Sequence, residues 1–209
     1  MPNPYFSIII PTYNRAIFIS KAIESVLNQS FKDFELIIID DASTDDTEIT
    51  IKQFKDSRII YSRNNINKER CISRNNGIKL SKGKYLCFLD SDDWYKENHL
   101  LNFYREIEKR LEPIAIFFSG ALNYSSKKIS ERPQAIYNDQ TKYGYILINT
   151  FGLPFSCVHS EVFKDFQLDP EIMVCEDLDF FLRACTKYKI IQIKSQEYVY
   201  NLHDETFTL

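Results

Sequence analysis

Short apolar runs alternate with amphipathic stretches along the first half of the chain. Continuous runs rich in β-branched residues predict buried strands, and apolar positions that recur with helical spacing predict helices between them. The expected strands are residues 6–14, 34–41, 58–62 and 84–90, and the expected helices are residues 16–30, 43–54, 68–83 and 96–111. This alternation predicts an α/β fold with a mostly parallel central sheet and helices on both faces.

Local signals set the ends of two of these helices. Ser43 or Thr44 can cap the helix at residues 43–54, where the acidic residues that follow favour the positive end of the helix dipole. Gly83 is the expected C-terminal stop of the helix at residues 68–83, because glycine is common just after a helix.

The pattern loosens after residue 113. We expect one more buried strand at 113–122, a polar, Tyr-rich stretch at 123–152 and a helix at 176–188, followed by the strand-like segments KIIQI and EYVYNL. The chain has no internal repeat, low-complexity tract or linker. Residues 1–209 are therefore interpreted as a single domain with two halves, 1–112 and 113–209.

Composition narrows the classes of function. With 44% hydrophobic residues the chain can bury a core, and its net charge of −3 argues against nucleic acid as the main partner, because phosphate binding needs a basic surface. No apolar stretch approaches the length of a membrane span, and no signal-peptide pattern is present. The five cysteines form no CxxC pair and are expected to be reduced core residues of a cytosolic protein.

Acidic residues gather where two of the predicted strands end. Asp40 and Asp41 close the second strand, and Asp90, Asp92 and Asp93 follow the fourth. Ligands of open parallel sheets bind at the carboxyl ends of the strands, and carboxylates this close repel one another unless a cation, a helix N-terminus or water compensates. For the first cluster taken alone, an ordinary helix cap remains an open alternative.

The usual glycine loops for phosphate are missing. The chain has five Gly and contains neither GxGxxG after a strand nor GxxxxGK[ST]. The charge of a nucleotide diphosphate would then have to be met by a divalent metal held by aspartates. Mn²⁺ or Mg²⁺ fits better than calcium, because the acidic loops lack the Gly and Glu positions of an EF-hand.

The segments SIIIPTYNR, SVLNQSF and DFELIIIDDASTDDT, followed by NKERCISRNNGI and KGKYLCFLDSDDW, resemble the nucleotide-sugar-binding half of family-2 glycosyltransferases. The similarity covers about the first half of the chain and resumes at CEDLDFFLR (175–183), which is similar to the family's Glu-Asp acceptor-site motif. The resemblance implies the GT-A fold, a nucleotide-sugar-binding half at 1–112 and an acceptor-side half at 113–209.

The resemblance also implies a pocket for the nucleotide base. The loop that packs on the base is matched by Pro11, Thr12 and Tyr13. Asp41 resembles the carboxylate that accepts the N3–H of the base. Such an acceptor favours uracil or thymine over cytosine, whose N3 has no hydrogen, so a UDP-sugar is the expected donor.

The segment DSD matches the family's Asp-x-Asp signature. Asp90 resembles the residue near the ribose, with Ser91 beside it in the nucleotide-sugar site. Asp92 resembles the metal ligand, and Asp93 is able to replace or assist it. His203 is a further candidate for a metal or phosphate contact, with a lone surface histidine as the alternative.

The chain departs from the common pattern before the helix at 68–83. Glu69 and Arg70 stand where many relatives carry a flexible Gly. Arg70 or Arg74 is expected to reach the base or the diphosphate, and the residues leave open which one. Helix capping or packing is the equal alternative for Arg74.

The second half supplies the acceptor side. Asp177 resembles the catalytic base, and Glu176 is expected to orient the acceptor or simply to begin a helix, where acidic residues are favoured. Trp94 is a candidate for stacking on a sugar face, with packing under a loop as the alternative.

Together these features indicate a metal-dependent inverting glycosyltransferase that acts on a glycan or lipid-linked acceptor in polysaccharide or cell-surface glycan synthesis. Two alternatives are a sugar-phosphate nucleotidyltransferase, which expects a Gly-rich loop after the first strand, and a non-catalytic nucleotide-sugar or glycan-binding module. The sequence does not reveal the sugar, the acceptor or the linkage. Relatives often continue into a membrane-associating segment, so we expect a piece of a longer cytoplasmic chain that works at the inner face of the membrane.

Overall fold

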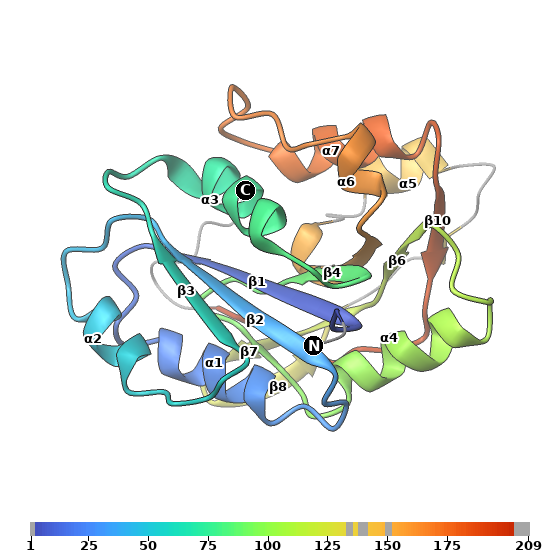
Figure 1. Cartoon of the computed structure of the whole chain (residues 1–209). Helices are drawn as coiled ribbons and strands as arrows, with labels where there is room; N and C mark the ends of the chain where they lie inside the picture. The colour runs from blue at the N-terminus through green and yellow to red at the C-terminus, as the bar shows by residue number, and fades with distance from the viewer. Residues whose placement is uncertain (1–2, 133–135, 138–141, 149–151, 203–209) are drawn as a thin grey trace.

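The computed structural model describes residues 3–132, 136–137, 142–148 and 152–202. Its centre is a seven-stranded sheet (Figure 1). In spatial order the strands are β10 (Lys189–Gln192), β6 (Ala115–Phe118), β9 (Ser156–His159), β4 (Tyr85–Phe88), β1 (Phe6–Thr12), β2 (Phe34–Asp40) and β3 (Ile59–Arg63). Only β9 runs antiparallel to its neighbours, so the predicted mostly parallel sheet is confirmed.

Helices cover both faces of this sheet, as the sequence pattern predicted (Figure 1). One face carries α1 (Ile19–Leu27), α2 (Thr47–Lys52) and α4 (His99–Glu108), and the other carries α3 (Glu69–Leu80), α5 (Lys142–Ile148), α6 (Val162–Asp165) and α7 (Glu176–Ala184). Successive residues of β1 point into opposite cores: Ile8 and Ile10 pack on the α1 side and Ile9 on the α3 side. Burial on both faces explains the continuous apolar runs.

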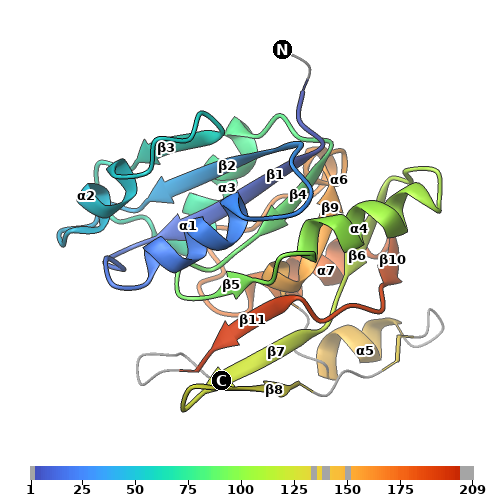
Figure 2. The same cartoon turned by 90° about the horizontal axis from the view of Figure 1, so that it is seen from below.

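A second, four-stranded sheet lies beside the first (Figure 2). Its strands are β5 (Trp94–Tyr95), β11 (Tyr198–Asn201), β7 (Ala121–Ser125) and β8 (Lys128–Glu131). The single strand predicted at 113–122 is wrong, because Ser119 and Gly120 leave the central sheet and donate their N–H groups to Phe155 O and Ser195 O. The chain thereby passes from one sheet to the other. The short helix η2 (Leu153–Phe155) leads into β9.

The predicted start of the second helix is wrong. Helix α2 begins at Thr47, and neither Ser43 nor Thr44 caps it. The Asp45 carboxylate instead accepts hydrogen bonds from the N–H of Thr47 and from the N–H of Ala16. Residues 41–46 form a loop before the helix, and this loop packs on the end of β1.

Gly83 is not a helix stop, because α3 ends at Leu80 and the backbone of Gly83 has no left-handed conformation. Its role is a close approach of two chain segments. A Cβ atom at Gly83 would lie 2.4 Å from the backbone N of Ser7. Glycine is needed here because β1 and the turn before β4 leave no room for a side chain.

Among the described helices, none combines the length and the apolar character needed to cross a membrane.

We predict that Gly83→Ala lowers the free energy of unfolding by about 1–3 kcal/mol or more, because its Cβ would overlap backbone atoms that cannot rotate away. Gly144→Ala is the matched control, since a Cβ there meets no atom within 4 Å. In a helix this control should be neutral or stabilising by up to about 1 kcal/mol. Chemical denaturation of both variants measures the difference. Equal unfolding midpoints would contradict the close-approach role.

Candidate active site

The two acidic clusters converge at the carboxyl edge of the central sheet. Strand β1 lies between β2 and β4, so Thr12 at its end has Asp41 on one side and the segment after β4 on the other. The N–H of Asp41 donates to Thr12 O at 2.8 Å. Pro11 and Thr12 are buried, whereas Tyr13 is 43% exposed. The predicted base-binding loop and both acidic clusters thus share one edge.

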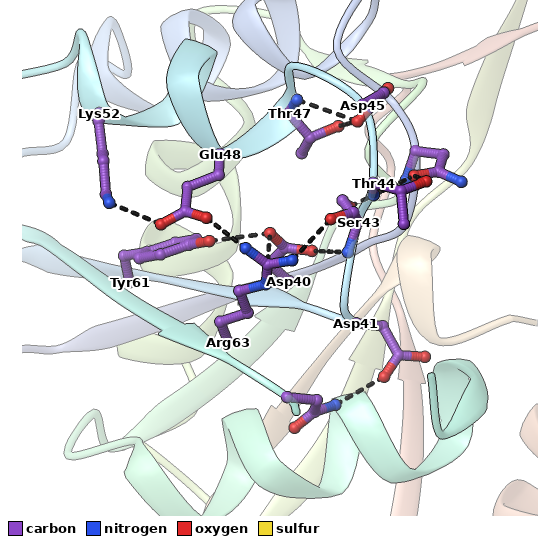
Figure 3. A network of polar contacts seen from close by, with 12 residues as sticks. Asp40, Asp41, Ser43, Thr44, Asp45, Thr47, Glu48, Lys52, Tyr61 and Arg63 are labelled. Atoms are coloured by element: carbon purple, nitrogen blue, oxygen red, sulfur yellow. Dashed lines mark hydrogen bonds and ion pairs between the residues drawn. The ribbon is translucent and has the colours of Figure 1, made fainter. Parts of the chain in front are cut away.

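Asp40 anchors the loop after β2 (Figure 3). Its fully buried carboxylate accepts one hydrogen bond from Ser43 N–H and one from the Tyr61 hydroxyl, both at 2.8 Å. Arg63 reaches the same loop and donates to Ser43 O at 2.7 Å. Burial and the neighbouring carboxylate of Asp40 raise the pKa of Tyr61. Asp40 is therefore a structural anchor of the loop.

Asp41 points away from that network, toward the start of α3 (Figure 3). Asn64 Nδ2 donates to its Oδ1 at 2.7 Å, and Lys68 N–H lies 3.0 Å from both carboxylate oxygens. These donors hold the carboxylate in a fixed direction. A carboxylate has about four lone-pair sites, so it retains capacity for a further donor.

Asn14 joins the loop after β1 to the loop after β2. It has a left-handed backbone (φ 51°), its N–H donates to Ser43 Oγ, and its Oδ1 accepts from Thr44 N–H at 2.8 Å. Sequence reasoning missed Asn14 and Asn64. Both follow strand ends at this edge, so the rule that drew attention to the aspartates could have found them.

The three aspartates after β4 have different surroundings. Asp93 is 2% exposed, and its oxygens accept from the Tyr198 hydroxyl and from Asn201 N–H at 2.7 Å. Burial raises the pKa of Asp93 well above its usual range, and the neighbouring Asp90 adds to the shift. Asp93 thus fastens β11 to this loop, and the structure does not bring it to the open side of the cluster.

Asp92 and Asp90 lie nearer the surface of the same loop. Their side chains are 21% and 33% exposed, and Ser91 between them is buried. Arg15 Nε lies 3.9 Å from Asp92 Oδ2. Within the described residues no three His, Cys, Asp or Glu side chains form a metal-binding group. A cation at Asp92 would have to take most of its ligands from a substrate or from water.

Arg74 links the two halves of the chain. Its Nη1 lies 2.7 Å from Glu176 Oε1 and 3.1 Å from Asp177 Oδ1, and its Nη2 lies 2.9 Å from Asp90 Oδ1. Arg70 Nε pairs with the same Glu176 oxygen at 2.8 Å. The predicted catalytic base therefore lies beside the donor-side cluster, although more than 80 residues separate Asp177 from Asp90. Both Nη atoms of Arg74 are occupied by protein carboxylates.

Asp177 lies in the first turn of α7. The helix starts after Cys175, whose left-handed backbone (φ 63°) turns the chain inward. Leu153 N–H donates to Asp177 Oδ2 at 3.1 Å. Burial raises the pKa of Asp177 to about 6, against the opposing effect of Arg74 and with support from Glu176 and Asp90. The pKa of Asp177 is thus raised although Arg74 favours the ionised form and the side chain is 20% exposed.

Two remaining candidates lie elsewhere. The Trp94 ring has Lys21 Nζ 2.9 Å from its centroid and the Tyr124 ring centroid 5.0 Å away, so side chains of the fold pack on it. This arrangement matches the alternative of aromatic packing more closely than an open sugar-stacking face. His203 lies outside the described residues.

Comparison with known proteins assigns the chain to a family. The model of the family "Glycosyl transferase family 2" matches residues 7–164, which is most of the chain. The chain belongs to glycosyl transferase family 2.

Among curated relatives, the chain is 40% identical over 152 residues to the Escherichia coli UDP-Glc:alpha-D-GlcNAc-diphosphoundecaprenol beta-1,3-glucosyltransferase WfaP. This match covers 69% of this chain and 58% of WfaP. It is 42% identical over 93 residues to the Campylobacter jejuni GalNAc(5)-diNAcBac-PP-undecaprenol beta-1,3-glucosyltransferase, covering 43% of this chain and 30% of that protein. The chain therefore spans less than two thirds of either relative.

Among solved structures, S. aureus TarS 1-349 in complex with UDP-GlcNAc matches with a TM-score of 0.82 at 21% identity, covering 99% of this chain and 60% of that chain. The Pyrobaculum calidifontis mannosyltransferase PcManGT, in complex with GDP-Man and Mn²⁺, matches with a TM-score of 0.74 at 14% identity, covering 97% of this chain and 58% of that chain. At these identities the similarity shows the shared GT-A fold.

Proposed function

We propose that this chain transfers a sugar from a UDP-sugar to an acceptor hydroxyl, with inversion at the anomeric carbon and Asp177 as the general base. The observation that supports this most directly is the contact of Arg74 with both Asp90 and Asp177, which sets a carboxylate of raised pKa beside the donor-side cluster. A general base needs a pKa near the working pH and a fixed direction.

The donor site consists of the loop after β1, Asp41 and the loop after β4. Pro11, Thr12 and Tyr13 would contact the base, and the remaining acceptor capacity of Asp41 would take the N3–H of uracil. Asp90 and Ser91 would line the ribose side. Arg70 is the candidate of the two arginines for the diphosphate, because its side chain is 52% exposed and, among the described residues, pairs with Glu176 alone, whereas Arg74 is buried and both of its Nη atoms pair with carboxylates. The names of WfaP and of the TarS complex support UDP.

The residues at the second cluster fit a divalent cation with hard oxygen ligands. Asp92 would hold Mn²⁺ or Mg²⁺, which bind through one or two carboxylates together with substrate phosphates and do not need a cage of protein ligands. When bound, the cation supplies positive charge to the diphosphate leaving group, which then needs no general acid. The Mn²⁺ in the PcManGT complex supports a divalent ion in this fold.

The chemical step follows from where the base lies. Asp177 would accept the proton of the acceptor hydroxyl while the hydroxyl oxygen forms a bond to the anomeric carbon. The bond from that carbon to the diphosphate oxygen breaks, and its electron pair leaves with the nucleotide. Attack on the face opposite the diphosphate gives a β-linked product from an α-linked donor. Leu153 N–H and Arg74 would keep both oxygens of Asp177 oriented during this transfer.

The acceptor side is formed by residues 113–209, with Glu176 beside the base. The names of WfaP and of the Campylobacter jejuni relative both specify a sugar acceptor that is linked through diphosphate to undecaprenol. A lipid-linked acceptor in polysaccharide synthesis, handled at the inner face of the membrane by a cytoplasmic domain, is therefore the proposed substrate. A non-catalytic binding module is the alternative, and donor hydrolysis with and without EDTA separates the two.

Asp177→Asn should lower the transfer rate by about 10²–10⁴-fold, because asparagine cannot accept the proton. Donor binding should remain, since Asp177 belongs to the other half of the fold. The wild-type rate should also fall about tenfold per pH unit below pH 6, because the base is active only when ionised and its pKa is raised to about 6. A radiolabelled transfer assay over pH 5–8 measures both effects. Near-normal turnover of Asp177→Asn with a lowered melting temperature would mean that Asp177 has only a structural role at the start of α7.

Asp92→Ala and Asp93→Asn form a second, matched pair. Asp92→Ala should abolish Mn²⁺-dependent UDP binding in calorimetry and leave the melting temperature near that of the wild type. Asp93→Asn should keep Mn²⁺-dependent binding but lower stability by about 1–3 kcal/mol, because the contacts with Tyr198 and Asn201 are buried. The reverse result would exchange the roles of the two residues.

Competition among UDP, dTDP, GDP and CDP tests the base pocket. UDP or dTDP should compete best with the donor, because only uracil and thymine combine a small ring with the N3–H that Asp41 accepts. The best competition by GDP or CDP would refute this assignment of Asp41.

A further inference from the structure

One buried guanidinium holds the candidate base in place. Arg74 is 2% exposed and extends from α3 to carboxylates that follow β4 and begin α7. A guanidinium has five N–H groups in a rigid planar fork, so it fixes the relative positions of the groups that it joins. The ammonium of lysine is a single point and cannot reproduce this geometry.

The same face of α3 also holds the segment that leads into α7. Cys71 Sγ donates to Asp169 O at 3.1 Å, and Asn75 Nδ2 donates to Leu168 O at 2.8 Å. Arg74 lies three residues after Cys71 and one before Asn75. Helix α3 therefore positions both the approach to the base and the base itself.

We propose that Arg74 is a positioning residue, which aims the carboxylate of Asp177 at the acceptor hydroxyl and ties it to the donor-side carboxylate of Asp90. This inference rests on the proposed role of Asp177 as base. It differs from both sequence-based expectations for Arg74, which were a contact with the nucleotide and helix capping or packing.

The charges around Asp177 allow the positioning role of Arg74 to be measured through the titration of Asp177. Arg74 faces it from α3, Asp90 from the loop after β4 and Glu176 from its own helix. Arg70 pairs with Glu176. Two guanidinium groups, Arg70 and Arg74, therefore pair with the three carboxylates of this group. The thiol of Cys71 lies near enough for Asp177 to contribute to its raised pKa. In this group Arg74 favours the ionised form of Asp177, and Glu176 and Asp90 oppose it.

Three substitutions give distinct expectations. Arg74→Gln removes the favourable charge and should move the acid limb of the rate profile up by about 1 pH unit or more. Glu176→Gln removes an opposing charge and should move that limb down. Arg74→Lys keeps the charge, so the limb should stay near its wild-type position while kcat falls by about 10²-fold through misalignment. KM for the nucleotide-sugar should change little in Arg74→Lys.

Arg183→Gln is the matched control on α7. It removes a guanidinium whose partners are Asp179, with Nε 2.9 Å from Oδ2, and Gln167, with Nη2 2.8 Å from the backbone O. It should shift neither the acid limb nor kcat. Carbon-13-detected carboxyl titration of the labelled protein without substrate gives a second readout, with the Asp177 signal assigned from its loss in Asp177→Asn. If Arg74→Gln does not fold, Glu176→Gln still tests the downward shift, and Arg74→Lys still tests the loss of kcat at an unchanged acid limb.

Transfer of the sugar by the wild type is measured first, because absence of transfer would contradict the proposed function. The carboxyl titration needs no reaction, so it tests the positioning role of Arg74 separately. Opposite shifts of the Asp177 titration in Arg74→Gln and Glu176→Gln, with a lowered kcat in Arg74→Lys, support the proposal. An unchanged titration and an unchanged kcat, with a raised KM for the nucleotide-sugar alone, would overturn it and make Arg74 a donor contact.

Discussion

The pairing of Arg74 with three carboxylates is the contact on which the site depends. Removing a guanidinium from water costs several kcal/mol, and this cost is offset only when the partners are close and well directed. Here the partners come from the loop after β4 and from α7, at distances of 2.7–3.1 Å. Separating α7 from α3 would leave buried charges unpaired. Helix α7 in the second half of the chain is thus fixed to the first half by electrostatics as well as by apolar packing.

In both acidic clusters, the adjacent aspartates have different surroundings. Asp40 and Asp93 are buried, and their oxygens are used by donors from Tyr61 and Tyr198 and from the backbone. Their neighbours point in other directions: Asp41, which is also buried, accepts from Asn64 and Lys68 N–H, and Asp92 is 21% exposed. Adjacent carboxylates repel less when they point in different directions and each has its own donors. One aspartate of each pair therefore stabilises a loop, and the other is the one that we propose for the ligand.

The two sheets position different parts of the candidate site. The parallel strands bring the loop after β1, Asp41 and the cluster after β4 to one edge. The smaller sheet is joined to that edge by β5, which directly follows Asp93, and by the contact of Tyr198 with Asp93. A change in the second half of the chain can therefore reach the donor-side loop through β11.

The sequence by itself determined the first four strands of the central sheet and the edge at which the candidate site residues gather, but it did not predict the antiparallel β9. Strands buried on both faces need continuous apolar runs, so β1, β2 and β4 were visible in the local pattern, and the rule for parallel sheets located Asp41 and Asp90. The family resemblance added the roles. Local sequence could not separate Asp92 from Asp93, because the difference comes from Tyr198 and Asn201, more than 100 residues away. Only the tertiary structure brought Arg74 to Asp177 and left Gly83 against Ser7, since such contacts depend on packing between distant segments and not on periodicity.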